Sequence, residues 1–170
     1  MKVEEAIKMA IVFEKKVRDV YFDAAVQLDR HECKKVLEVL AQEEQSHVDY
    51  LEFKLNEWKN TGRLSADTID TVIPSKERIS QGATEVKNRL VVENRDSELQ
   101  ILGRALEVET ETSNFYKKMV DTMEFDARKM FARFLEIENG HLAIVEAEID
   151  AVQRMGFWFD MPEFNLEVQG

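Results

Sequence analysis

The near absence of proline is the feature that most constrains the fold of this sequence. The 170 residues contain only Pro74 and Pro162, so residues 1–73 and 75–161 have none. With six glycines in all, these long segments lack the turn residues that a fold of many short strands needs. Their apolar residues instead recur at steps of three and four, the spacing of an amphipathic helix. The sequence therefore predicts an all-α fold.

Four helices are predicted, at about 3–28, 32–60, 97–122 and 126–155. Short turns join them into two hairpins, and Gly62 is expected to end the second helix in a left-handed conformation. Residues 61–96 form a long crossover, with a short helix expected near 76–92. Four-helix bundles with one long crossover have this layout. Residues 1–170 are interpreted as one domain, whose aromatic tail, 156–170, is expected to dock on the bundle or on a partner subunit.

Charge and composition exclude several classes of partner. The formal net charge is −11, which argues against binding of nucleic acid or of an anionic membrane surface. No apolar run is long enough for a signal or membrane segment. Cys33 is the only cysteine, so no disulfide framework or four-cysteine metal centre is expected. We expect a cytoplasmic protein.

An internal repeat relates the two predicted hairpins. Residues 5–21 align without gaps on 100–116, and residues 36–55 align on 130–149. The offsets, 95 and 94 residues, agree to within one residue. Each hairpin is therefore expected to supply half of a pseudo-symmetric site.

Polar residues interrupt the apolar stripes at matched positions of this repeat. An ionised carboxylate buried alone is very unfavourable, so it must be neutralised, paired or bound to a metal. Each hairpin supplies one glutamate and one Glu-x-x-His pair, the ligand set of di-iron and di-manganese bundles. Mixed carboxylate and imidazole ligands favour two iron ions, with manganese or a mixed pair as alternatives. The candidate metal ligands are Glu14, Glu44, His47, Glu109, Glu138 and His141.

Residues close to these ligands have two expected roles. Tyr21 and Tyr116 follow their glutamates by seven residues on the same helix face, where each would donate a hydrogen bond to a ligating carboxylate. The alternative is a core tyrosine whose hydroxyl is satisfied elsewhere. Glu43, Glu107 and Glu111 flank the ligands and are predicted to be surface charges.

These motifs resemble the ferritin-like superfamily, and most closely the di-iron domain of rubrerythrins, over residues 3–155. The resemblance implies that Glu14 and Glu109 are terminal ligands, that Glu44 and Glu138 bridge the metals, and that the two histidines complete the site. It also implies reduction of hydrogen peroxide, or oxygen, by a diferrous centre. Rubrerythrins typically carry a rubredoxin-type four-cysteine iron centre as well, which one cysteine cannot form. Electrons would then come from an external carrier such as a rubredoxin.

One departure from this resemblance keeps other functions open. Peroxidase rubrerythrins have a further glutamate three residues after the third-helix ligand, where this sequence has Thr112. A ferroxidase that handles iron is the main alternative, and a non-enzymatic helical interaction module is a further one. A homodimer is expected, and a domain-swapped dimer, in which the crossover hands a hairpin to a neighbour, is an alternative.

Overall fold

Four α-helices with defined bounds make up most of the computed structural model, which describes residues 1–28, 31–73, 78–79 and 96–155. The helices are α1 (Val3–Gln27), α2 (His31–Thr61), α4 (Asp96–Thr122) and α5 (Phe125–Met155). Their bounds differ from the expected ones by at most one residue. The described residues contain no strand, so the all-α prediction is confirmed.

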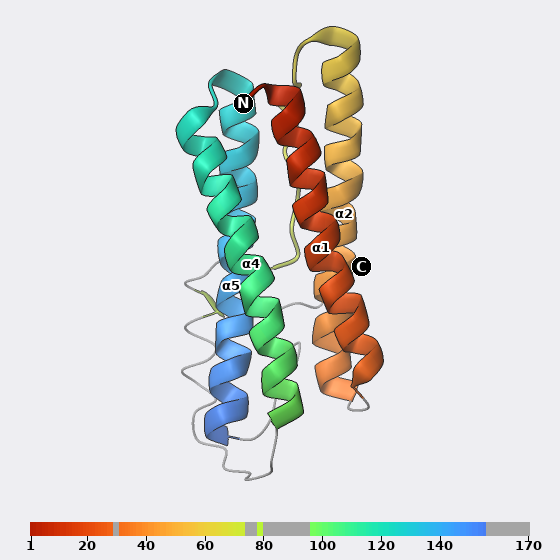
Figure 1. Ribbon diagram of the computed structural model, residues 1–170, viewed down its shortest axis with the longest axis vertical. Coiled ribbons are helices and arrows are strands. Elements are labelled where there is room, and N and C mark those ends of the chain that lie inside the picture. The colour runs from red at the N-terminus through yellow and green to blue at the C-terminus, as the bar shows by residue number, and fades with distance from the viewer. Residues whose placement is uncertain (29–30, 74–77, 80–95, 156–170) are drawn as a thin grey trace.

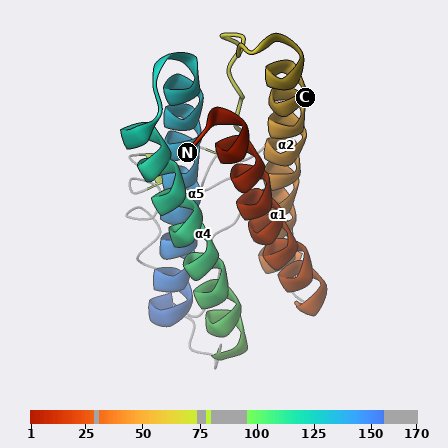
Figure 2. The ribbon, with the colours of Figure 1, turned by 45° about the horizontal axis from the view of Figure 1, so that its top comes forward.

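The helices form two hairpins that lie side by side. Figure 1 shows α1 against α2 and α4 against α5, and the rotated view in Figure 2 agrees. The chain leaves α2 at the same end of the bundle at which α1 begins, whereas α4 begins at the opposite end. The connection between α2 and α4 must therefore travel the length of the bundle, which explains its length.

Gly62 ends α2 as predicted. Its φ of +67° lies in the left-handed region, which glycine reaches without the steric cost of a side chain. Its N–H donates a hydrogen bond to the carbonyl oxygen of Trp58 at 2.8 Å, which satisfies a carbonyl at the helix end. The chain can then turn back along the bundle.

The interior consists of two apolar clusters separated by a polar layer. The first cluster lies at the end where α1 begins and contains Ile7, Ile11, Leu51, Phe115, Phe131 and Phe134, among others. The second lies at the opposite end and contains Val17, Leu37, Leu40, Val108, Ile144 and Val152, among others. On α1, Glu14 falls between Ile11 of the first cluster and Val17 of the second. The charged side chains therefore lie in the middle of the core rather than at its surface.

The crossover is fixed to α2 by Lys54, a buried lysine that the sequence reasoning did not single out. Its side chain is 1% exposed, and its Nζ lies 2.5 Å from Asp67 Oδ1 and 2.7 Å from Ser65 Oγ. Nζ also donates to the backbone carbonyl of Ser65 at 3.1 Å. A charged donor satisfied in this way stabilises the fold of the segment around it.

Some sequence-based expectations fall outside the described residues. These are most of the short helix near 76–92, the aromatic tail at 156–170 and the side chain of Cys33. Within the described ranges, no helix combines the length and the apolar character needed to cross a membrane.

Replacing Lys54 by methionine keeps the apolar stem and removes the donors to the crossover. We expect Lys54→Met to lower the free energy of unfolding by about 1–2 kcal/mol, because the crossover loses the hydrogen bonds that this buried, charged donor makes to Ser65 and Asp67. Urea unfolding followed by circular dichroism measures this, with Lys59→Met, an exposed position on the same helix, as the control. Equal effects of the two substitutions would contradict this role.

Candidate metal centre

The six predicted ligands meet in the polar layer between the two apolar clusters. Each of the four helices contributes to the group: α1 and α4 supply one glutamate each, and α2 and α5 supply one Glu-x-x-His pair each. A spacing of three residues places the members of each pair on one helix face. All six side chains are fully buried: Glu14, Glu44, His47, Glu109, Glu138 and His141.

The six residues form two overlapping groups of possible ligands. One contains Glu14 and His47, and the other contains Glu109 and His141. Both groups also contain Glu44 and Glu138. Within each group, one ligand atom from every residue lies within 4.8 Å of the others. A carboxylate-bridged metal pair needs this arrangement: two shared glutamates in the middle, and one glutamate and one histidine on each side.

The two histidines face the carboxylates through the same ring atom. His47 Nδ1 lies 3.1 Å from Glu14 Oε2, 3.1 Å from Glu44 Oε2 and 3.4 Å from Glu138 Oε1. His141 Nδ1 lies 2.6 Å from Glu44 Oε1 and 3.5 Å from Glu109 Oε1. The rings are nearly parallel, at 4°, with centroids 5.5 Å apart. In each ring, Nδ1 is therefore the nitrogen that would contact a metal held by these carboxylates.

Several oxygens at the centre of the group make no hydrogen bond, although imidazole nitrogens lie close to some of them. Among the described residues, both carboxylate oxygens of Glu44 and of Glu138, and Oε2 of Glu109, lack a hydrogen-bond partner. A buried polar atom left unpaired costs about 1–3 kcal/mol, and more when it is charged. Oxygens that converge with imidazole nitrogens in this way suit a pair of divalent cations. The residues present thus fit a two-metal site.

Burial, together with neighbouring negative charge, raises the pKa of two of these carboxyl groups. Burial, and then the charge of Glu44, raises the pKa of Glu14 to about 8. Burial, and then Glu44 and Glu14, raises the pKa of Glu138 well above its usual range. Burial alone would also raise the pKa of Glu44, but His141 and His47 lower it well below its usual range. The metal-free site therefore holds protons where cations would otherwise balance the charge.

The carboxylates act on the histidines in the opposite sense. Burial disfavours the charged form of His47, but Glu14 and Glu44 hold its pKa well above the usual value. Burial is likewise outweighed at His141, whose pKa Glu44 and Glu138 raise. A metal would have to displace these protons.

The two tyrosines connect the hairpins to each other. Tyr21 on α1 donates its hydroxyl hydrogen to Glu109 on α4, and Tyr116 on α4 donates to Glu14 on α1. Burial, and then the facing carboxylate, raises the pKa of both tyrosines well above the usual value. Both hydroxyls therefore stay protonated donors, and each orients the carboxylate of the other hairpin.

A comparison with known protein families agrees with this geometry. A family model described as Rubrerythrin matches residues 5–149. This chain belongs to the rubrerythrin family. No curated protein and no solved structure shows a match to the chain.

The prediction that Glu43 is a surface charge is wrong. In this member of the rubrerythrin family its side chain is buried, with 7% exposed, and it accepts a hydrogen bond from the hydroxyl of Thr71 in the crossover. The prediction rested on its place off the apolar stripe, although the repeat aligns Glu43 with Ile137, a core residue of the second hairpin. The available signal was its spacing, one helical turn before His47. Glu107 and Glu111, the other two flanking glutamates, are exposed as predicted.

Metal affinity should rise with pH, because a cation must displace the proton that Glu14 holds below a pH of about 8. For that proton alone, the apparent association constant should increase about tenfold per pH unit between about pH 6 and 8. Competition with a chelator measures the affinity. In Glu14→Gln the slope of the logarithm of this constant against pH should fall by about one. An affinity of the unaltered protein that does not change with pH would contradict the role of the Glu14 proton.

Removing either tyrosine hydroxyl should weaken metal binding. We expect Tyr21→Phe and Tyr116→Phe each to lower the affinity about 10-fold or more, because a ligating carboxylate loses the donor that orients it. Chelator competition again provides the measurement. Tyr50→Phe is the matched control, since the Tyr50 hydroxyl donates to the backbone carbonyl of Asp67 at 2.9 Å. A loss of similar size in all three variants would contradict the specific role.

Proposed function

We propose that this protein is a di-iron oxidoreductase that reduces hydrogen peroxide, or oxygen, with electrons from a separate carrier protein. The observation that carries the proposal is the pair of buried ligand groups that share Glu44 and Glu138, in a chain of the rubrerythrin family. Such a centre needs two metal positions held at a fixed separation, and shared carboxylates provide this. Iron is the metal that we propose, with manganese or a mixed pair as alternatives.

A bound pair of ferrous ions would supply two electrons, which with two protons convert one hydrogen peroxide into two water molecules. The side chains of the site would hold and orient these metal ions. Glu44 and Glu138 would span both metals, while Glu14 and Glu109 would each bind one. With only these six side chains as ligands, the metals would remain accessible to the oxidant. Because the ligands lie between two apolar clusters, bulk water is excluded and the electrostatic interactions inside are strengthened.

The tyrosines would keep the ligand carboxylates in the same orientation when the charge of the metals changes. Tyr116 holds Glu14, and Tyr21 holds Glu109, from the opposite hairpin. A hydroxyl that donates to a terminal carboxylate fixes its orientation and tunes its strength as a ligand. Neither hydroxyl loses its proton easily, since the pKa of each tyrosine is raised.

Electrons must return to the metals after each turnover. The sequence contains one cysteine, so these residues cannot form a four-cysteine iron centre of their own. We therefore propose a separate donor, such as a rubredoxin, that docks on the protein. We also propose a homodimer as the assembled form.

A ferroxidase is a second candidate, and Thr112 is the observation that favours it. The resemblance to peroxidase rubrerythrins implies a glutamate at this position. Thr112 is instead buried, and its hydroxyl donates to the carbonyl oxygen of Val108 at 2.8 Å. No additional carboxylate is offered to the metals from this part of α4.

Stopped-flow oxidation of the iron-loaded, reduced protein tests the reaction. We expect oxidation by hydrogen peroxide to be faster than oxidation by oxygen by on the order of tenfold or more, a barrier difference of about 1.4 kcal/mol or more. Glu138→Ala, which removes a shared ligand, should abolish the fast phase, whereas Glu107→Ala, an exposed position on α4, should keep it.

Two results would contradict the peroxidase proposal. Equal rates with both oxidants, or a faster reaction with oxygen, would favour the ferroxidase. A closed shell of many subunits in size-exclusion chromatography, rather than a dimer, would support iron storage.

A further inference from the structure

Glu43 is a buried carboxylate beside the proposed metal centre that belongs to neither of the overlapping ligand groups. It precedes Glu44 on α2 and is 7% exposed. One of its oxygens accepts a hydrogen bond from the Thr71 hydroxyl, and the Thr71 hydroxyl also accepts one from the backbone N–H of Ile73 at 3.0 Å. The crossover therefore holds this carboxylate in one orientation.

Near Glu43, His47 and His141 each have a second ring nitrogen that does not face the ligand carboxylates. Their Nδ1 atoms face the ligand carboxylates, so the other nitrogen of each ring, Nε2, points elsewhere. Both side chains are fully buried, and in the described part of the chain neither Nε2 atom has a hydrogen-bond partner. A histidine that binds a metal through Nδ1 carries its proton on Nε2, and a buried donor of this kind requires an acceptor.

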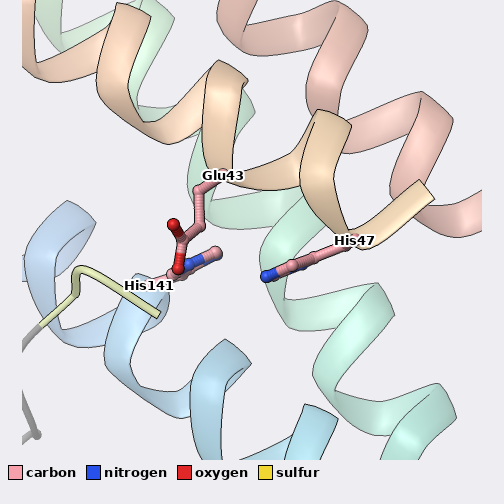
Figure 3. A group of neighbouring side chains, drawn as sticks. All are labelled: Glu43, His47 and His141. Atoms are coloured by element: carbon pink, nitrogen blue, oxygen red, sulfur yellow. The ribbon is translucent and has the colours of Figure 1, made fainter. Parts of the chain in front are cut away.

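Glu43 is within reach of both rings. One ligand atom from each of Glu43, His47 and His141 lies within 4.8 Å of the other two. Figure 3 shows the Glu43 carboxylate beside the ring of His141, with the ring of His47 directed toward the same place. Small rotations of these side chains would bring a carboxylate oxygen to hydrogen-bond distance of an Nε2–H group.

We propose that Glu43 is a positioning residue of the metal centre, whose carboxylate accepts the Nε2–H of the ligating histidines while Thr71 holds it in place. The inference rests on the proposed two-metal site. A carboxylate acceptor fixes the tautomer and orientation of a ligating imidazole and makes its other nitrogen a stronger ligand. It thereby links the crossover, through Thr71 and Glu43, to the metals.

The alternative role for Glu43 is direct ligation of a third cation together with the two histidines. Each imidazole would then have to bind metals through both of its nitrogens, which requires loss of the Nε2 proton. Accepting a proton that is already there needs no such step. The hydrogen bond is therefore the better explanation of the geometry, and the third cation becomes an outcome of the test.

The test compares Co²⁺ binding to the full chain and its variants, so it does not depend on peroxide chemistry. We expect Glu43→Ala to lower the affinity for Co²⁺ about 10-fold or more, with two ions still bound per chain, one for each ligand group. Glu38→Ala, an exposed position on α2, should leave the affinity unchanged. Glu43→Gln, which keeps an acceptor oxygen, should recover part of the loss.

Proton NMR of the Co²⁺-loaded protein measures the Nε2–H groups directly. Their signals would not change if Glu43 only stabilised the fold. The histidine Nε2–H protons should appear as hyperfine-shifted signals that exchange slowly with D₂O. In Glu43→Ala at least one of them should shift and exchange faster. Thr71→Val should act in the same direction with a smaller effect, and it tests the link even if Glu43→Ala does not fold.

Three outcomes would overturn the inference. One is a Glu43→Ala protein with the affinity and Nε2–H signals of Glu38→Ala. Another is the loss of one bound Co²⁺ per chain on the Glu43→Ala substitution, which would make Glu43 a ligand. The last is an unaltered protein that binds no Co²⁺, which removes the metal site itself. Failure of peroxide oxidation alone, with Co²⁺ binding as expected, would count only against the proposed reaction.

Discussion

The mutual repulsion of buried carboxylates is the constraint on which the rest of this structure depends. Glu14, Glu44, Glu109 and Glu138 are fully buried within one layer, where their charges are poorly screened. Protons relieve the repulsion in part, since the pKa of Glu14 rises to about 8, yet the oxygens of the shared glutamates stay without donors. Two cations would satisfy these oxygens and the charge together. Much of what surrounds this layer acts to hold the carboxylates in place against that repulsion.

The bundle achieves this by building each support from the opposite hairpin. Tyr21 of the first hairpin holds Glu109 of the second, and Tyr116 of the second holds Glu14 of the first. The hairpins are thereby joined through the site as well as through the apolar clusters on either side of it. The crossover adds a third support on the α2 side, where Lys54 fixes its beginning and Thr71 reaches Glu43. Binding or loss of metals at the site should therefore affect both hairpins and the crossover.

Sequence reasoning succeeded where a residue had a matched partner. Glu44 and His47 align with Glu138 and His141, and this repetition together with helical spacing predicted a group that the structure brings together. It failed where the halves differ. Glu43 was classed as surface charge because it lies off the predicted apolar stripe of its helix, although its counterpart Ile137 is a core residue. Lys54 lies within the repeat but belongs to none of the predicted ligand motifs. Both side chains have hydrogen-bond partners in the crossover. Such contacts between distant segments leave no periodic signal in the sequence.

Anomalous diffraction at the iron edge, from crystals of protein loaded anaerobically with Fe²⁺, tests the central claim most directly. Two peaks are expected within the layer, one in each ligand group, with Glu44 and Glu138 contacting both. Nδ1 of His47 and of His141 should each contact one peak. A layer without iron, or a single ion bound outside these six side chains, would contradict the account and favour a polar core that serves only to hold the helices together.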